Sequence, residues 1–228
     1  MIFADRKDAA EQLALGLDRY RGHFPLILAI PRGALEMGSV LAARLQGELD
    51  VVLVRKLRAP YQPELAIGAI DETGWSYLFP HVASLGVTDQ YLEDEERHQL
   101  EVLQARRSQY SAVRPPADPA GRIAVVVDDG LATGATMIAA LHAVRARNPE
   151  TLVCAVPVAA EESLEHVRRY ADVVVCLQTP PAFYAVGECY RSFAQIEDEA
   201  AVQILKQAVA RNKSPSPKPS LDAQDHRP

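Results

Sequence analysis

The feature that most constrains this chain is a run of five apolar residues followed by two acids and a loop of small residues. It occupies residues 123–136, with the sequence IAVVVDDGLATGAT. Five consecutive apolar residues predict a strand that is covered on both faces, as in a parallel sheet. The small residues lead into a predicted helix from Gly134 to about Arg147. We therefore expect an α/β fold in which Asp128 and Asp129 stand at the carboxyl end of a core strand.

Apolar runs and amphipathic segments alternate along the rest of the chain. This alternation is typical of a doubly wound, mainly parallel sheet flanked by helices. Residues 1–211 are interpreted as one domain, and the Pro-rich residues 212–228 as a disordered tail. Buried strands are expected at 26–30, 51–57, 152–156 and 173–177, and a hairpin at 66–71 and 75–79. Helices are expected at 8–20, 34–45, 88–110, 161–170 and 197–211, with Thr88 as the N-cap of the third.

Composition excludes several classes of protein. A formal net charge of −6, with scattered basic residues, gives no field that would gather nucleic acid. The N-terminal residues lack the apolar run of a signal peptide, and no stretch approaches the ~20 apolar residues that span a bilayer. Three widely spaced cysteines and dispersed histidines predict neither a disulfide framework nor a zinc site. We expect a soluble, cytoplasmic protein without a membrane partner.

The acidic pair and the loop after it predict a ligand. Two adjacent carboxylates repel each other, and the hydroxyls of a vicinal diol can satisfy both by donating hydrogen bonds to them. Small residues before a helix let backbone N–H groups converge on an anion, and the helix dipole adds to the attraction. The hydroxyls of Thr133 and Thr136 can donate as well. A diol beside a phosphate describes a ribose 5-phosphate.

Other uses of such a loop fit the residues less well. A dinucleotide turn would show GxGxxG, and its pyrophosphate would be opposed by the acids. A P-loop would show GxxxxGK[ST], which is absent. A phosphatase with an aspartate nucleophile would carry a second acid where Gly130 stands. A purely structural turn would not need two acids beside an anion-binding loop.

The segment VVVDDGLATGAT closely resembles the signature of type I phosphoribosyltransferases, which bind phosphoribosyl pyrophosphate (PRPP). The resemblance extends over roughly residues 26–201 and implies that family's fold, with a small hood and a flexible lid. In the family, the two acids bind the ribose 2- and 3-hydroxyls and the following loop binds the 5-phosphate. The resemblance therefore assigns PRPP binding to Asp128, Asp129, Gly130, Leu131, Ala132, Thr133, Gly134, Ala135 and Thr136.

The resemblance also assigns roles to three other segments. The loop at 31–38 would bind pyrophosphate through Arg32 and Gly33, and Lys56 would reach the same group from the end of its strand. Residues 57–80 would form the lid, with Arg58 and Tyr61 as candidate ligand contacts, and residues 88–112 a helical insertion. Residues 1–22 and 180–200 would form the hood. There Phe183 and Tyr184 are the first candidates to stack on a base, and Tyr190 and Phe193 the second.

The function implied is transfer of the 5-phosphoribosyl group of PRPP to a nitrogenous, nucleobase-like acceptor, with release of pyrophosphate. Asp128, Asp129, Arg32 and Lys56 are the candidate catalytic residues. Mg²⁺ is expected to be held mainly through PRPP, with Asp129, acting through water, as the candidate protein contact. Ala132 stands where hypoxanthine- and guanine-type members carry an aspartate, which argues against a 6-oxopurine acceptor. Relatives commonly dimerise, so a homodimer is expected.

Two alternatives stay open at this point. A PRPP- or nucleotide-binding regulatory protein on the same fold would keep the signature without transferase activity. A small hydrolase of phosphorylated ribosides would need a positioned base, and the sequence indicates none. The lid and the pyrophosphate loop favour the enzyme, while no complete subfamily signature identifies its acceptor.

Overall fold

Five parallel strands form the main sheet of the protein, described here from a computed structural model of residues 2–80 and 82–213. The strand order is β2 (Glu48–Val51), β1 (Leu26–Ala29), β6 (Ile123–Val127), β7 (Thr151–Val158) and β8 (Val173–Gln178). Each neighbouring pair is parallel. The central strand β6 ends at Val127, so the acidic pair Asp128 and Asp129 stands at its carboxyl end.

Helices cover both faces of this sheet. Successive residues of β1 and β6 belong alternately to two cores, so that Ile27 and Val125 pack on one side and Leu28 and Val126 on the other. The first core is completed by α1 (Arg6–Gly16), α2 (Ala34–Leu45) and α6 (Asp198–Lys213), and the second by α4 (Ala135–Arg145) and α5 (Glu161–Val167). The predicted doubly wound α/β fold is confirmed, and burial on both faces explains the uninterrupted apolar runs.

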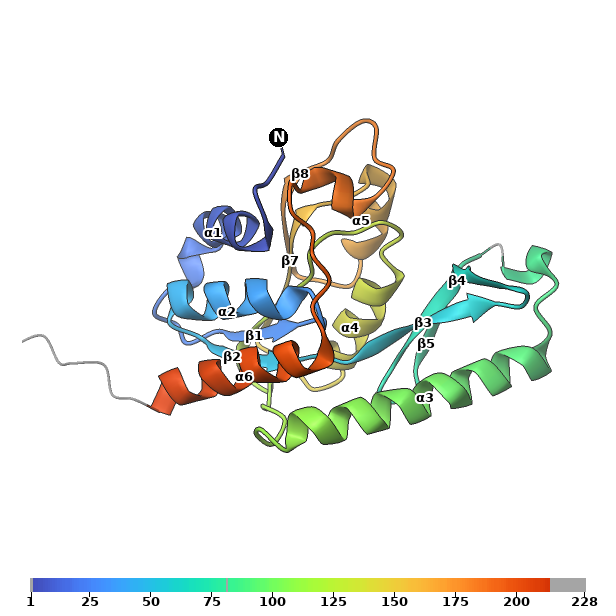
Figure 1. The fold of residues 1–228 in the computed structure, drawn as a ribbon, viewed down its shortest axis with the longest axis horizontal. Coiled ribbons are helices and arrows are strands. Elements are labelled where there is room, and N and C mark those ends of the chain that lie inside the picture. Colours follow the sequence, from blue (N-terminus) through green and yellow to red (C-terminus); the bar gives the residue numbers. More distant parts are fainter. Residues whose placement is uncertain (1, 81, 214–228) are drawn as a thin grey trace, which may run out of the picture.

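Three antiparallel strands form a small sheet beside the main one. They are β3 (Val54–Ala59), β4 (Gln62–Asp71) and β5 (Ser76–Leu78), in that order. Helix α3 (Asp89–Ser111) runs along the small sheet, and the two together project from the side of the main sheet (Figure 1). The side chain of Thr88 accepts a hydrogen bond from the Tyr91 N–H, which confirms Thr88 as the predicted N-cap.

The single strand predicted at 51–57 is wrong, because β2 ends at Val51 and β3 begins at Val54 in the other sheet. Val52 and Leu53, which link the two sheets, are both buried, so the apolar run continues through the break. Neither glycine nor proline marks the crossing. From Lys56 to Ala59 exposed and buried residues alternate, which is typical of a strand with one exposed face.

Much of the segment predicted as the lid, residues 57–80, is strand. β3 and β4 form a hairpin around Pro60 and Tyr61, with register shifts on either side of Arg58. The predicted hairpin between β4 and β5 is present, and its turn is held by Asp71, whose carboxylate accepts hydrogen bonds from the N–H groups of Thr73 and Trp75. Gly74 in this turn has a φ of +93°, which favours glycine.

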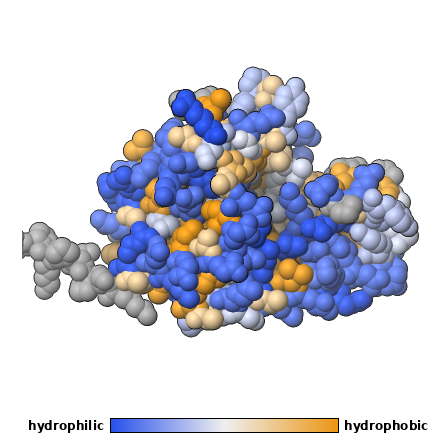
Figure 2. All heavy atoms as spheres, in the orientation of Figure 1, coloured by the Kyte–Doolittle hydropathy of each residue, from blue (hydrophilic) through white to orange (hydrophobic). Residues whose placement is uncertain are grey.

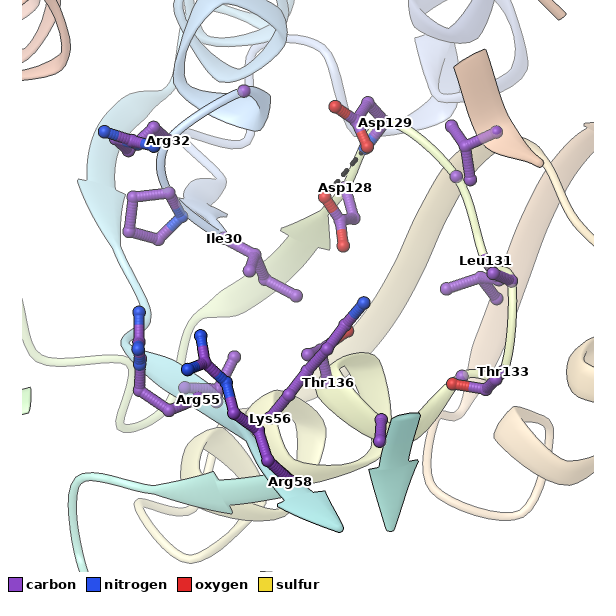
Figure 3. Close-up of a pocket in the computed structure, with 18 of the residues that line it drawn as sticks. Ile30, Arg32, Arg55, Lys56, Arg58, Asp128, Asp129, Leu131, Thr133 and Thr136 are labelled. Carbon is purple, nitrogen blue, oxygen red and sulfur yellow. Dashed lines mark hydrogen bonds between the residues drawn. The ribbon is translucent and has the colours of Figure 1, made fainter. Parts of the chain in front are cut away.

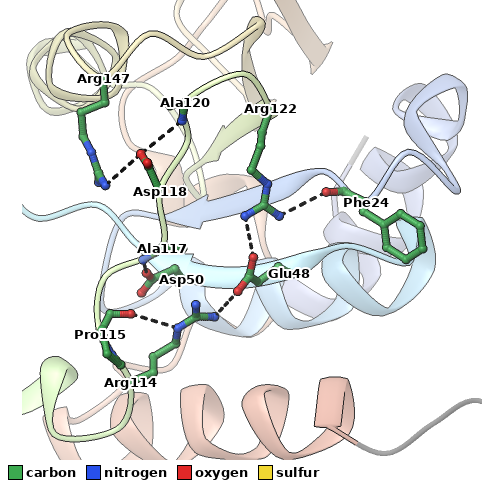
Figure 4. Close-up of polar contacts among 10 residues, drawn as sticks. All are labelled: Phe24, Glu48, Asp50, Arg114, Pro115, Ala117, Asp118, Ala120, Arg122 and Arg147. Carbon is green, nitrogen blue, oxygen red and sulfur yellow. Dashed lines mark hydrogen bonds and ion pairs between the residues drawn. The ribbon is translucent and has the colours of Figure 1, made fainter.

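The connection from α3 to β6 is tied to strand β2 by charged groups (Figure 4). The carboxylate of Glu48 pairs with Arg114 and Arg122, each at 2.6 Å. The buried Asp50 accepts hydrogen bonds from the N–H groups of Val51 and Ala117, at 2.8 and 2.6 Å. These contacts hold the segment that follows α3 against the main sheet.

The remaining elements are three 3₁₀ turns: η1 (Asp18–Tyr20), η2 (Val82–Leu85) and η3 (Val186–Cys189). Hydrophilic side chains dominate the face shown in Figure 2, with hydrophobic residues in small patches. Within residues 2–80 and 82–213, no helix combines the length and the apolar character needed to cross a membrane. Asn212 and Lys213 belong to α6, and the rest of the predicted tail lies outside the described residues.

Candidate active site

A cavity of about 420 Å³ lies between the carboxyl ends of β1 and β6 and the small sheet. Acidic and small residues of the loop after β6 form one wall, and basic residues form the wall opposite (Figure 3). This size suits a small ligand. The residues that line it are Ile30, Pro31, Arg32, Gly33, Val54, Arg55, Lys56, Arg58, Glu64, Ala66, Arg106, Asp128, Asp129, Gly130, Leu131, Ala132, Thr133, Gly134, Thr136 and Val186.

The acidic pair stands at the end of β6, as predicted. The Oδ1 atom of Asp128 accepts a hydrogen bond from the Asp129 N–H at 2.9 Å. Burial, and next the charge of Asp129, raise the pKa of Asp128 well above its usual range. Burial also raises the pKa of Asp129, and the guanidinium of Arg6 opposes that rise. Asp129 is therefore the acid of the pair whose negative charge has a buried cationic partner.

Arg6, a residue of α1, holds the carboxylate of Asp129. Its Nε donates to Oδ2 of Asp129 at 2.9 Å, and its Nη2 lies 2.9 Å from the same oxygen. Its Nη1 donates to the carbonyl oxygen of Ala194 at 2.7 Å, and its guanidinium lies 3.8 Å from the centre of the Phe193 ring. Only 8% of the Arg6 side chain is exposed. Such a buried ion pair depends on full hydrogen bonding of both partners.

Arg6 is not among the site residues predicted from the sequence, although a signal for it is present there. Arg6 precedes Ala9, Ala10 and Leu13 by three, four and seven residues, so all four lie on one face of α1. All four are buried. An arginine on the apolar face of a helix indicates a buried anionic partner.

Aromatic residues of the C-terminal segment support the same acid. The Tyr190 hydroxyl donates to the carbonyl oxygen of Asp129 at 2.6 Å, and burial raises the pKa of that hydroxyl. The Tyr190 and Phe193 rings lie 4.9 Å apart. These two residues, the second candidates for base stacking, therefore pack against the acidic pair and Arg6 in this structure.

The loop of small residues is fastened to the neighbouring strand and helix. The N–H of Leu131 donates to the Val158 carbonyl, and the Ser163 hydroxyl donates to the Ala132 carbonyl at 2.6 Å. Gly134 has a φ of +79°, after which α4 begins at Ala135. Ala135 is buried and does not line the cavity, whereas the other residues assigned to this loop do.

The loop after β1 approaches the acids closely. A Cβ atom at Gly33 would lie 2.6 Å from Oδ2 of Asp129 and 3.0 Å from Nε of Arg6. No side chain fits in that space without a shift, so glycine is required. The peptide between Pro31 and Arg32 is cis.

The basic wall contains three of the predicted cations and two further ones. Lys56 extends toward Asp128, whereas the guanidinium of Arg32 is turned away from the acids (Figure 3). Arg32 lies 3.5 Å from Glu197 and 3.7 Å from Asp198, at the start of α6. Arg58 lines the cavity as predicted, and so do Arg55 of β3 and Arg106 of α3, which had been assigned no ligand contact.

Three of the predicted contacts lie away from the cavity. Tyr61 occupies the tip of the β3–β4 hairpin, where its side chain is fully exposed. Phe183 and Tyr184 line a separate depression together with Ile2, and Tyr184 is 83% exposed. These aromatic residues follow β8 by several residues, so the end of the strand does not direct them toward the site.

Comparisons with known proteins agree with this geometry. The phosphoribosyl transferase domain family matches residues 2–192. A protein of Mycobacterium tuberculosis named "Putative phosphoribosyl transferase" is 43% identical over 208 residues, which are 91% of this chain. Those residues are 47% of that protein, so the chain spans about half the length of these curated relatives.

Two further comparisons extend this result. The crystal structure of the protein TT1426 from Thermus thermophilus superposes with a TM-score of 0.76 at 44% identity, over 91% of this chain and 99% of that one. The uracil phosphoribosyltransferase of Bifidobacterium longum is 30% identical over 149 residues, which are 60% of this chain and 65% of that protein. With its parallel sheet, its acidic pair and this family match, the chain belongs to the phosphoribosyl transferase domain family.

Proposed function

We propose that this protein transfers the 5-phosphoribosyl group of PRPP to a nitrogenous acceptor and releases pyrophosphate. The observation that carries the proposal is the pairing of Asp128 and Asp129 with a phosphate-sized loop, across one cavity from a wall of cations. A phosphorylated sugar that also carries a diphosphate matches both walls. The ribose hydroxyls would donate to the acids, and the 5-phosphate would accept from the backbone N–H groups of the loop and from Thr133 and Thr136.

The chemistry would depend on charge and position. The bond from ribose C1 to the pyrophosphate oxygen breaks as a bond from C1 to the acceptor nitrogen forms, and positive charge develops on the sugar. Asp128 and Asp129 would lie close enough to stabilise that charge, and Lys56 and Arg32 would stabilise the leaving pyrophosphate. No covalent intermediate with the protein is required.

Mg²⁺ fits this site as a companion of the ligand. The described residues contain no group of three or more His, Cys, Asp or Glu side chains placed to hold a metal. Two carboxylates at the cavity wall suit Mg²⁺, which commonly takes one or two carboxylates together with phosphate oxygens and water. When bound, the ion would neutralise the pyrophosphate oxygens, and Asp129 is the residue that would contact it through water.

The acceptor is proposed by class only. Ala132 supplies no acid or base to the cavity, which argues against a 6-oxopurine. Uracil belongs among the acceptors tested because one relative is named for it. The competing proposal, a regulatory protein that binds PRPP or a nucleotide without transfer, is favoured by the Arg32 side chain, which is turned toward Glu197 and Asp198 rather than into the cavity.

A direct test is to incubate the protein with Mg²⁺, PRPP and each of a panel of nucleobases, and to measure pyrophosphate release. We expect release that depends on one acceptor or a few related ones. Tight PRPP binding without release for any acceptor would favour the regulatory protein, and absence of PRPP binding would overturn both functions.

Because Arg32 is paired with two acids at the start of α6, we expect removal of those acids to raise the affinity for PRPP. Glu197→Gln combined with Asp198→Asn should free the guanidinium to face the cavity and so strengthen PRPP binding. Exposed ion pairs contribute up to about 1 kcal/mol, so a gain of about two- to fivefold is expected by calorimetric titration. Glu199→Gln, on the same turn, should change little. A gain that persists in an Arg32→Gln background would contradict this role for Arg32.

A further inference from the structure

Helix α3 brings a cation to the cavity that the sequence motifs did not indicate. Arg106 is half-buried on this helix and lines the cavity with Arg55, Lys56 and Arg58. Within residues 2–80 and 82–213, no carboxylate lies within ion-pair distance of any of these four side chains. These four cations make no ion pair among the described residues, although Glu64 lines the same cavity and the charge of Glu95 partly opposes the lowering of the pKa of Arg55.

The cations of this wall are close enough to repel one another. Burial lowers the pKa of the Arg55 guanidinium, and the charges of Arg106 and Arg58 lower it further. A like-charge cluster at a partly buried surface is costly unless an anion neutralises it. A ligand with several negative charges on adjacent oxygens would reduce the repulsion between these cations.

A series of contacts holds these charges together by fastening α3 to the small sheet. Nε of Arg55 donates to Oε1 of Gln99 at 2.8 Å, and Gln99, which is 1% exposed, donates in turn to Glu95 at 3.0 Å. Arg107, the neighbour of Arg106, makes two hydrogen bonds of 2.7 Å to Glu72.

Further contacts lie toward the start of the helix. The Tyr91 hydroxyl donates to the carbonyl oxygen of Arg58 at 2.9 Å, and the Arg58 N–H donates to Glu95 at 3.1 Å. The Ser76 hydroxyl donates to Glu96 at 2.6 Å. The helix that carries Arg106 is thus fastened to the strand that carries Arg55 before any ligand arrives.

We propose that Arg106 is a pyrophosphate-binding residue supplied by α3, and that Gln99 is a positioning residue that aims Arg55 at the same group. The proposal rests on the proposed function, which places the 5-phosphate at the loop of residues 130–136 and so leaves the diphosphate end of PRPP for the opposite wall. Helix α3 then forms part of the binding site instead of only covering the small sheet. Guanidinium groups suit this task because they present several donors to phosphate oxygens.

The experiment compares Arg106→Gln with Arg97→Gln, which removes the same charge from an exposed position on the same helix. Titration calorimetry would measure the binding of inorganic pyrophosphate with Mg²⁺, of PRPP with Mg²⁺, and of ribose 5-phosphate. Arg106→Gln should weaken pyrophosphate and PRPP binding about tenfold or more and leave ribose 5-phosphate binding nearly unchanged. Arg97→Gln should bind all three ligands as the wild type does.

Gln99→Met tests the positioning role, because methionine keeps the length of the side chain and removes the acceptor for Arg55. Its pyrophosphate affinity should fall by about three- to tenfold, and its ribose 5-phosphate affinity should stay the same. A merely structural role would lower both affinities together. Equal losses for both ligands would therefore overturn the positioning role of Gln99.

The outcomes separate this proposal from the proposed function. If the wild type binds pyrophosphate and Arg106→Gln binds it equally well, the role of Arg106 is overturned and the transferase proposal is untouched. If Arg106→Gln loses pyrophosphate affinity while the wild type transfers to no acceptor, the role of Arg106 is supported and the transferase proposal fails. A wild-type protein that binds neither pyrophosphate nor PRPP overturns both.

Discussion

Asp128→Asn is expected to make the protein more stable and, at the same time, unable to hold PRPP. The amide keeps the shape of the side chain and can still accept the Asp129 N–H. It removes a carboxylate that burial and a neighbouring acid make costly to ionise. Loss of charge-assisted hydrogen bonds to the ribose should weaken PRPP binding about 100-fold or more. Each kcal/mol gained in stability would raise Tm by about 2–4 °C.

The gain in stability should depend on pH in one direction. The pKa of Asp128 is higher in the folded protein than its ordinary value of 3.8, so folding is favoured by this group at low pH and loses that contribution as the pH rises. The Tm difference between Asp128→Asn and wild type should be small near pH 4 and grow toward pH 8. Thermal unfolding across that range is the measurement, and a constant or negative difference would contradict it.

Asp129→Asn, the same change one residue later, should destabilise the protein. The buried Arg6 would lose its anionic partner, and removing one partner of a buried ion pair costs about 3–5 kcal/mol. PRPP binding should be lost here as well. We therefore expect Asp128→Asn to raise Tm and Asp129→Asn to lower it, although both variants lose PRPP binding. Equal changes in Tm would show that the contact with Arg6 does not make the two acids differ in their effect on stability.

Arg6→Gln should cause the second large effect. Removing one partner of a buried ion pair costs about 3–5 kcal/mol, which corresponds to a fall in Tm of roughly 10 °C. The guanidinium opposes the rise in the pKa of Asp129 that burial causes, so its removal should raise that pKa further. PRPP binding should then weaken as the pH falls, and do so at a higher pH than in the wild type.

Two variants make the Arg6 experiment interpretable. Lys7→Gln removes a charge from the next residue, whose side chain is 67% exposed, and should leave both Tm and the pH dependence unchanged. Arg6→Lys keeps the charge without the two-nitrogen contact to Oδ2, so it should fold and show an intermediate pH dependence. The measurement is PRPP affinity from pH 5 to 8. If its pH dependence is the same in both Arg6 variants as in the wild type, Arg6 affects packing and not the pKa of Asp129.

Sequence reasoning was accurate where local patterns decide the structure. The strand at β6, the helix bounds of α2 and the cap at Thr88 follow from apolar periodicity and hydrogen-bonding side chains within a few residues. The pattern gave no sign of the passage from β2 to β3, because Val52 and Leu53 are buried between two sheets. An apolar run that is buried throughout gives no sequence signal at the point where the chain passes from one sheet to the other.

The candidate site shows the same division. The residues of the loop after β6 are neighbours in sequence, and all of those assigned to it except Ala135 reach the cavity. Arg106 reaches the cavity, and Arg6 reaches Asp129 at its wall, through packing of distant helices. Phe183 and Tyr184 were predicted to stack on a base because they follow the last strand, but they line a separate depression. The position of Arg6 on the apolar face of its helix indicates a buried anionic partner, but only the tertiary structure identifies that partner as Asp129.

The contact between Arg6 and Asp129 joins residues 123 positions apart, one in the segment expected to select the acceptor and the other in the sugar-binding signature. Exchanging hoods between relatives to change acceptor preference would therefore also exchange the counterion of an acid that holds the donor. A chimera whose new hood lacks an arginine at this position should bind the sugar poorly whatever acceptor it prefers. Retaining residue 6 from this chain is thus a design rule for such chimeras.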